Sequence, residues 1–294
     1  MLLPVRASAQ DDGARAYLPG PADMDVLMVL GVSIDGNRSG DPATIIEGAE
    51  LSVDSIGLMY SRTTAIQGKP AALFVALPYG RIGGRVRTTS GDLSASSKGF
   101  GDVMFGGSIT LLGAPPTTAA EYVQFKPSTS VGLLVKVGAP TGQYDVRRPL
   151  NLGANRWMLQ VGVPVIWYVG DSMVDPGLLT FELMPSVSVF TDNSDVANAD
   201  RTSQRPVYRI EGHISKSFLS KHFLSLDGLF TQGGETEIDG VPSGNSQRSL
   251  ALGATYSYSP NATNTVRFTY GRNVHHNDSG MEGDMVRALW IHMF

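Results

Sequence analysis

The chain has 294 residues, of which 42% are hydrophobic and 17% charged, and its formal net charge at pH 7 is −4. It contains no cysteine, which excludes disulfides, thiolate metal sites and a cysteine nucleophile, and its charge gives no reason to expect nucleic acid as a partner. No apolar run approaches the roughly 20 residues that a membrane helix needs, because the richest stretch, 161–169, is interrupted by Pro164. We therefore expect a single domain made of strands and turns.

The N-terminal end contains Ala7-Ser8-Ala9, a small-residue pattern typical of a signal-peptide cleavage site. We interpret 1–9 as the end of a signal peptide and 10–23 as a periplasmic segment before the first strand. An ordinary flexible terminus is the alternative. The remaining chain, 24–294, is expected to form the barrel described next. Because no long hatch segment precedes the first predicted strand, any occlusion of a pore is expected to come from loops.

Segments with alternating apolar and polar side chains recur along the whole chain, which is typical of the strands of a transmembrane barrel. The predicted strands are 24–34, 51–66, 71–81, 101–112, 122–137, 156–169, 178–191, 206–218, 222–232, 247–258, 263–273 and 284–294. About twelve strands is an even number, as in single-chain bacterial barrels. The predicted fold is therefore all-β, a transmembrane antiparallel up-and-down β-barrel.

The predicted strand 156–169 shows the alternation most clearly, with Trp157 and Trp167 on its apolar face. These two residues are ten apart, which is roughly 33 Å along a strand and about 25 Å across a membrane when the strand is tilted. This is the spacing expected of two aromatic girdles at the membrane surfaces. The predicted girdle residues are Trp157, Trp167, Tyr208, Phe218, Tyr256 and Tyr258.

The opposite faces of the predicted strands carry polar residues that would line the lumen. Acids and bases are mixed, so ion pairs that brace a narrow barrel are favoured over a charge-selective filter. We hypothesise that a permeating solute passes Arg209, Glu211 and His213. The predicted pore-lining residues are Asp102, Lys136, Gln160, Glu182, Arg209, Glu211, His213, Asp227, Arg267 and Arg287.

The connections between predicted strands alternate between long and short. Outer-membrane barrels have long extracellular loops and short periplasmic turns, so the pattern predicts an outer-membrane location with both termini in the periplasm. The long connections are 35–50, 82–100, 138–155, 192–205 and 233–246, and the short ones include 67–70, 220–221 and 259–262.

The last predicted strand ends in an aromatic residue at the chain terminus. Trp290, His292 and Phe294 share one face of this strand. A terminal Phe preceded by alternating aromatic or apolar residues resembles the signal that the outer-membrane assembly machinery recognises. We therefore expect this machinery and outer-membrane lipid to be partners of the chain.

Two stretches carry a resemblance to a known family. One is 99–115, GFGDVMFGGSITLLGAP, and the more specific one is 137–157, in which Pro-Thr-Gly-x-Tyr-Asp is followed by Asn-Leu-Gly-x-Asn-Arg-Trp. They resemble the outer-membrane transporter family annotated with a meta-cleavage pathway of phenol degradation. The resemblance implies a channel, broadly similar to fatty-acid transporters, that passes small hydrophobic or aromatic compounds by passive diffusion.

The family-like loop 138–155 is rich in polar groups, and two interpretations of it remain open. It folds inward and narrows the pore, or its Asp, Arg and Asn side chains only hold its own turns. The candidate constriction residues are Tyr144, Asp145, Arg147, Arg148, Asn151 and Asn155.

Other classes of function find less support in the sequence. His275 and His276 lie in a predicted loop, and solvated histidines are favoured there over a metal site, so neither a metal nor a cofactor is expected. A barrel enzyme acting on lipid needs a close Ser and His pair, whereas His213 and Ser217 are about 13 Å apart along a strand. The glycine cluster at 80–84 reads as a turn and lacks the helix of a phosphate site. An enzyme is therefore not expected, and a lipid-acting barrel enzyme and a structural or adhesive barrel remain alternatives.

Overall fold

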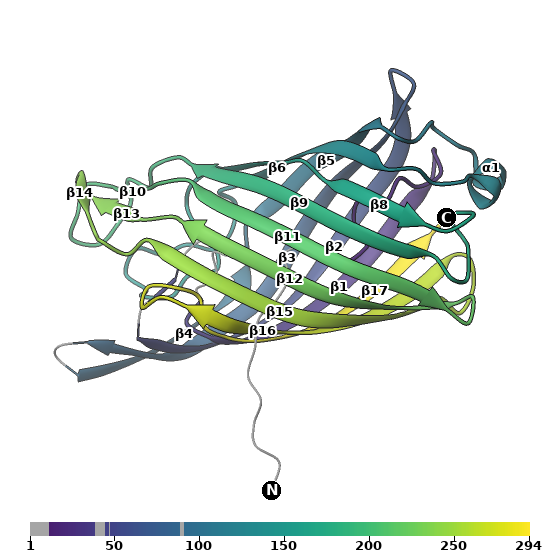
Figure 1. Cartoon of the computed structure of the whole chain (residues 1–294). Coiled ribbons are helices and arrows are strands. Elements are labelled where there is room, and N and C mark those ends of the chain that lie inside the picture. Colours follow the sequence, from purple (N-terminus) through teal and green to yellow (C-terminus); the bar gives the residue numbers. More distant parts are fainter. Residues whose placement is uncertain (1–11, 39–44, 47, 89–90) are drawn as a thin grey trace, which may run out of the picture.

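The computed structural model describes residues 12–38, 45–46, 48–88 and 91–294, and these form a closed β-barrel (Figure 1). Twelve antiparallel strands make the wall, one of them interrupted, which confirms the predicted fold class. In chain order the wall consists of β1 (Asp25–Gly36), β2 (Ala49–Ile66), β3 (Lys69–Thr88), β5 (Val103–Leu112), β6 (Ser130–Ala139), β7 (Met158–Gly162) with β8 (Val165–Val169), β9 (Leu179–Phe190), β11 (Val207–Phe218), β12 (His222–Gly233), β15 (Gln247–Tyr258), β16 (Asn264–His276) and β17 (Gly283–Met293).

Each wall strand pairs with its neighbours along the chain, and the last strand closes the barrel against the first. The closing pair β1–β17 runs from Val26 opposite Met293 to Gly36 opposite Gly283. The terminal residue extends this seam, because Phe294 N donates to Asp25 O at 2.9 Å and Asp25 N donates to Phe294 O at 3.1 Å. Among the described residues, closure gives each of the twelve wall strands a neighbour on both sides, as backbone groups inside a bilayer require.

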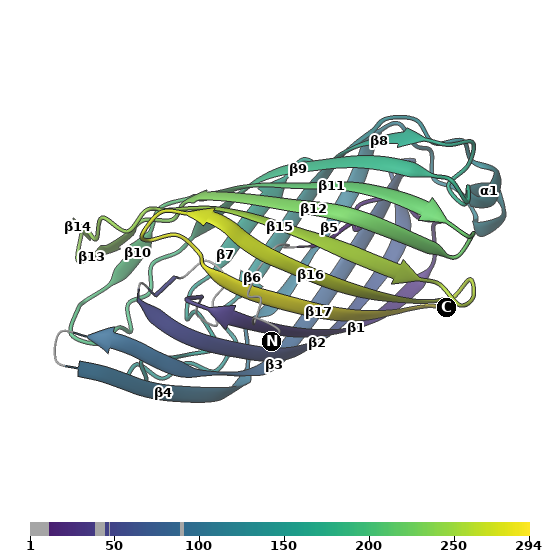
Figure 2. The ribbon, with the colours of Figure 1, turned by 60° about the horizontal axis from the view of Figure 1, so that its bottom comes forward.

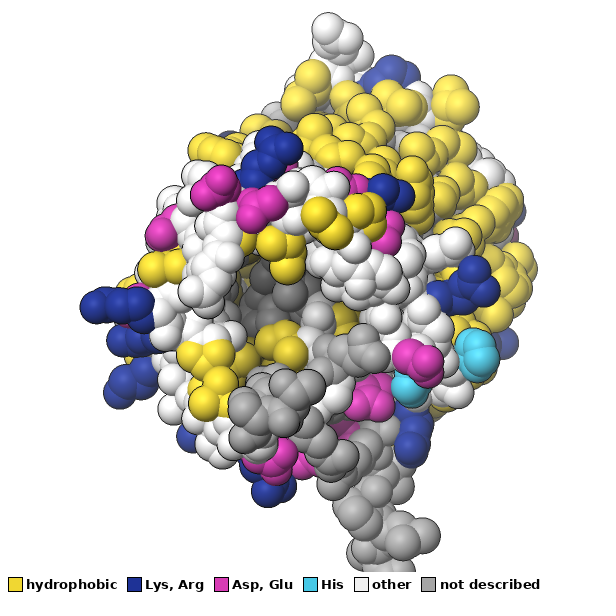
Figure 3. All heavy atoms as spheres, turned by 90° about the vertical axis from the view of Figure 1, so that its left-hand side faces the viewer, with side chains coloured by type: hydrophobic (Ala, Val, Ile, Leu, Met, Phe, Trp, Pro, Cys, Tyr) yellow, Lys and Arg dark blue, Asp and Glu magenta, His cyan; other side chains and the backbone are white. Residues whose placement is uncertain are grey.

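The alternation along the strands separates an apolar exterior from a polar interior. On β11, Tyr208 and Ile210 are 57% and 46% exposed, whereas Arg209 and Glu211, which alternate with them, are 9% and 2% exposed. Figure 3 looks onto one end of the barrel and shows the hydrophobic outer wall behind a rim that carries charged side chains. The large apolar side chains therefore lie on the surface that contacts lipid in a transmembrane barrel. No helix in the described part of the chain is long and apolar enough to cross a membrane.

The predicted strand 156–169 is divided into β7 and β8 at Val163 and Pro164. Proline has no backbone N–H and cannot donate to a neighbouring strand, so the ladder is interrupted there. The wall stays connected because Gly132 N donates to Pro164 O at 2.8 Å and Val163 N donates to Pro185 O at 3.0 Å.

The prediction of a strand over 122–137 is wrong in its first part. The short helix α1 (Ala119–Gln124) lies there, and β6 begins only at Ser130. Thr118 and Glu121 form a capping box, in which each side chain bonds the backbone N–H of the other residue. This arrangement satisfies amide groups that the first helical turn leaves free, and it favours a helix over a strand.

The predicted loop 82–100 and the predicted turn at 80–84 are also wrong. β3 continues through this region and pairs with β4 (Gly91–Phe100), so the hairpin extends beyond one end of the barrel (Figure 2). At the same end, β10 (Thr202–Gln204), β13 (Thr236–Ile238) and β14 (Val241–Pro242) form a small separate sheet. We call this end, which carries the long connections, the loop end.

His275 and His276 are exposed but belong to strand β16 rather than to the predicted loop.

Candidate functional site: the lumen and the segment inside it

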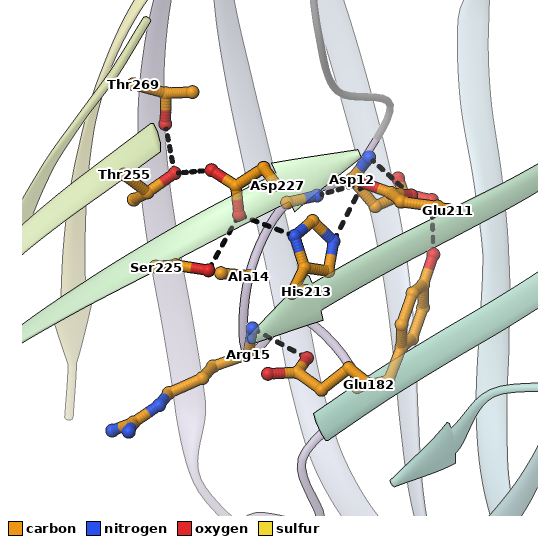
Figure 4. Close-up of polar contacts among 12 residues, drawn as sticks. Asp12, Ala14, Arg15, Glu182, Glu211, His213, Ser225, Asp227, Thr255 and Thr269 are labelled. Atoms are coloured by element: carbon orange, nitrogen blue, oxygen red, sulfur yellow. Dashed lines mark hydrogen bonds and ion pairs between the residues drawn. The ribbon is translucent and has the colours of Figure 1, made fainter. Parts of the chain in front are cut away.

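Residues 12–17 lie inside the barrel among the side chains that face the lumen (Figure 4). We call them the lumen segment. The sequence analysis expected this part of the chain to precede the barrel and any occlusion to come from loops alone, whereas the described residues 12–17 lie within the barrel. Gly13 and Ala14 are buried, so the segment fills part of the lumen.

Two buried carboxylates of the wall accept backbone N–H groups of the lumen segment. Glu211 on β11 accepts from Gly13 N at 2.9 Å and from Asp12 N at 3.3 Å. Glu182 on the adjacent strand β9 accepts from Arg15 N at 2.8 Å and from Thr180 Oγ1 at 2.9 Å. Hydrogen bonds to charged acceptors contribute more than neutral ones, so these contacts fix the path of the segment.

Basic side chains of the wall bind the oxygen atoms of the same segment. Lys136 Nζ on β6 lies 2.7 Å and 2.8 Å from the two carboxylate oxygens of Asp12, which also accepts a hydrogen bond from Tyr17. Arg287 donates to the carbonyl oxygen of Asp12 at 3.2 Å, and Arg267 donates to that of Ala14 at 2.8 Å. The wall thus holds the segment from several sides.

The chain then runs toward the end of the barrel opposite the loop end, where the turns 67–68, 219–221 and 259–263 and the longer connection with α1 lie. The guanidinium of Arg15 donates to Ser215 at 2.7 Å and to Ser217 at 3.0 Å, near the end of β11. Further along, Ala22 N donates to Thr117 O and Asp23 N donates to Thr63 O. The lumen segment therefore runs from the level of Glu211, near the middle of β11, toward that end of the barrel.

A polar network surrounds His213 on the lumen side of β11. Its Nδ1 lies 2.7 Å from Asp227 Oδ1 and its Nε2 lies 3.1 Å from Glu211 Oε1. Asp227 also accepts from Ser225 at 2.7 Å and from Thr255 at 2.8 Å. Because both ring nitrogens face carboxylate oxygens, the geometry calls for an N–H on each of them, as in an imidazolium.

The other predicted pore-lining residues have varied surroundings. Gln160 donates to Ser186 at 3.1 Å, and Arg209 donates to Ser188 at 3.3 Å, both pairs on the lumen side of the wall. Asp102 instead precedes β5, and its carboxylate accepts from Gly142 N and Ala154 N at 2.8 Å each. It therefore fastens the loop between β6 and β7 to the barrel.

The polar residues of that loop mostly bond one another. Asp145 accepts from the backbone and side chain of Arg147, both at 3.0 Å, and forms a 3.5 Å ion pair with Arg148. Donation from Arg147 lowers the pKa of Asp145 below its ordinary value. Asn151 bonds the backbone of Asp145 and Arg148. Outside this group, Tyr144 donates to Asp195 O and Asn155 donates to Asn193.

Two leucines of the same loop reach into the barrel, and the sequence analysis did not select them. Leu150 and Leu152 are 1% and 8% exposed. They pack in an apolar cluster with wall residues of β1, β2, β3 and β17, namely Ile34, Ala49, Leu51, Val53, Ile82 and Met285. The loop is thus anchored to the inner wall at the loop end by apolar rather than charged side chains, and we call this group the mouth cluster.

This difference between the two sets of loop residues predicts different effects on ion flow. We expect the double substitution of Asp145 and Arg147 by alanine to leave single-channel conductance within about twofold, because their bonds lie within the exposed turn. Leu150→Ala with Leu152→Ala is expected to raise it, since the loop loses its anchor in the mouth cluster. Conductance in planar bilayers measures both, and a larger effect from the polar pair would contradict this assignment.

The predicted girdle residues lie on the exterior. Trp157, Trp167, Tyr208 and Tyr256 are exposed, and Phe218 and Tyr258 are partly so. His222 stacks on Phe218, Tyr256 and Tyr258 with ring centroids 4.8 to 5.9 Å apart. At the end of β17, His292 stacks between Trp290 and Phe294 at 5.7 Å from each.

Deletion of Phe294 is expected to reduce the amount of folded barrel in cells severalfold. The deletion removes both backbone bonds between Phe294 and Asp25 at the closing seam, as well as the aromatic terminus of the proposed assembly signal. Heat-modifiable migration of the protein in outer-membrane fractions measures the folded amount. Phe294→Tyr keeps the ring and the seam and serves as the control. Equal amounts of folded barrel for the deletion variant and the wild type would mean that Phe294 is not needed for assembly.

Comparison with known proteins places the chain in a family. A family model described as the putative MetA-pathway of phenol degradation matches residues 34–286. The chain belongs to this family. No curated protein matches its sequence.

Solved structures with the same fold are outer-membrane barrels. An outer-membrane channel from Pseudomonas putida F1 superposes with a TM-score of 0.76 at 17% identity, covering 97% of this chain and 100% of that one. The translocator domain of the autotransporter NalP from Neisseria meningitidis gives a TM-score of 0.53 at 10% identity, covering 94% and 90%. With its apolar exterior, the chain has the fold of a Gram-negative outer-membrane barrel.

Proposed function

We propose that the chain is an outer-membrane channel that passes small hydrophobic or aromatic compounds by passive diffusion. The long connections would then lie outside the cell, and both termini in the periplasm. The observation that carries the proposal is the polar lumen, filled by a segment of the chain that polar contacts hold in place. The segment is part of the chain but not of the wall, and a polar lumen behind it suits a channel.

The class of solute rests on the family description, which names a pathway of phenol degradation. Phenol is a small aromatic molecule, and this supports aromatic compounds as the solutes.

An enzyme acting on lipid has less support from the geometry. His213 is bonded to Glu211 and Asp227, whereas Ser217 accepts from Arg15. A nucleophilic serine needs a base within hydrogen-bond reach, and this pair does not provide one.

Conductance and uptake test the proposed function. The purified protein is expected to give discrete current steps in planar bilayers and to admit phenol and benzoate into liposomes faster than protein-free liposomes do. Sucrose uptake serves as the control for leakage. A folded barrel that gives neither current nor uptake would exclude the channel and favour the structural or enzymatic alternatives.

A further inference from the structure

Two arginines in the lumen share one aromatic ring. The guanidinium carbons of Arg15 and Arg267 lie 4.3 Å and 5.3 Å from the ring centroid of Phe223. Arg15 belongs to the lumen segment and Arg267 to β16, so the ring brings together two positive charges from distant parts of the chain. Like charges repel at such distances, and an anion between them would remove the repulsion.

The partners of both guanidiniums are neutral oxygens. Arg15 donates to Ser215, Ser217 and the carbonyl oxygen of Leu178, and Arg267 donates to the carbonyl oxygen of Ala14. Among the residues that the structure describes, no carboxylate forms an ion pair with either guanidinium. A buried charge is costly unless an opposite charge compensates it.

The acids of the lumen are bound to other groups. Asp12 pairs with Lys136 at 2.7 Å, and Glu211 and Asp227 flank His213. Glu182 accepts from the backbone N–H of Arg15, not from its guanidinium. In the described residues, the hydrogen bonds of these acids therefore go to other groups, and Glu182 attracts the two guanidiniums through space without a hydrogen bond to either.

Ser257 adds a second, independent observation. It is the cross-strand partner of Arg267 on β15 and is 0% exposed. Within the described residues, neither Ser257 Oγ nor Arg267 Nε has a hydrogen-bond partner. Buried polar groups are nearly always bonded, so an N–H and a hydroxyl left without partners on adjacent strands mark a place for an acceptor.

We propose that Arg267, Arg15 and Ser257 form a binding site for the carboxylate of a small organic acid on its way through the lumen. Arg267 offers planar N–H donors that match the two oxygens of a carboxylate, and the Ser257 hydroxyl supplies a further donor. The site revises the expectation of a lumen in which acids and bases only brace one another. It rests on the proposed channel function and assigns organic acids as its solutes.

Binding and selectivity are measured separately on the full-length folded protein. Calorimetric titration in detergent is expected to detect sodium benzoate and not its neutral analogue benzyl alcohol. Loss of one charged hydrogen-bond partner typically weakens binding about tenfold or more, which is the effect expected for Arg267→Gln. Arg267→Lys keeps the charge without the planar fork, so weaker benzoate binding is expected with an unchanged ratio of chloride to potassium permeability.

Ser257→Ala keeps every charge and tests the site when Arg267→Gln does not fold. The substitution Ser257→Ala is expected to weaken benzoate binding severalfold. The control is Arg147→Gln, which removes an equal charge from the exposed loop. Equal benzoate affinity in wild type, Ser257→Ala and Arg267→Lys would overturn the proposed site. Benzoate binding without any conductance would contradict the channel function and leave the site standing, and conductance without benzoate binding would do the reverse.

Discussion

A chain that lacks residues 1–17 and begins at Leu18 is expected to conduct about threefold more than a chain that begins at Gln10. The truncation removes the lumen segment, whose buried Gly13 and Ala14 fill part of the lumen. The segment is not part of the backbone ladder of the wall, in which each of the twelve strands pairs with its two neighbours. A twelve-stranded barrel encloses more space than its own lining side chains fill.

The chain that begins at Gln10 is the matched control, since it retains the contacts from Asp12 to Tyr17. An intermediate effect is expected for Glu211→Gln, which keeps the size of the side chain and weakens its bonds to Asp12 N and Gly13 N. Single-channel recording measures all three proteins. Equal conductance with and without the segment would mean that another part of the lumen limits the conductance, with the mouth cluster as the remaining candidate.

The wall could be predicted because its signal is repetitive. Each strand alternates one lipid-facing and one lumen-facing residue, so β11 and β15 follow from the order of apolar and polar side chains alone. The same regularity failed at Pro164, where alternation continues but the backbone cannot donate. It also failed in the extended hairpin of β3 and β4, where glycines and serines carry no alternation.

The lumen segment could not be predicted by the same reasoning. Its contacts join residues as far apart as Gly13 and Glu211, which are 198 positions apart, and backbone N–H groups leave no mark in a sequence. Leu150 and Leu152 could not be predicted either, because two isolated apolar residues in a polar loop have no periodicity that indicates which surface they pack against. The signal for α1 was present, since Thr118 and Glu121 have the spacing of a capping box.

The substitution His213→Leu is expected to cause the largest loss of stability in the wall. His213 separates Glu211 and Asp227, which are 2% and 4% exposed, and it bonds both carboxylates. Removing one partner of a buried charged pair costs about 3–5 kcal/mol, because the remaining charge is left uncompensated. The midpoint of heat-modifiable unfolding in detergent, or of urea unfolding in lipid vesicles, measures the loss.

His222→Leu is the matched control, since His222 lies in the exterior girdle and its loss leaves no buried carboxylate. Adding Asp227→Asn to His213→Leu is expected to restore part of the lost stability, because the substitution removes one of the two charges. Restoration of this kind separates an electrostatic cause from a packing defect, which the asparagine would not repair. If His213→Leu unfolds at the same midpoint as His222→Leu, the carboxylates are compensated by groups other than this histidine.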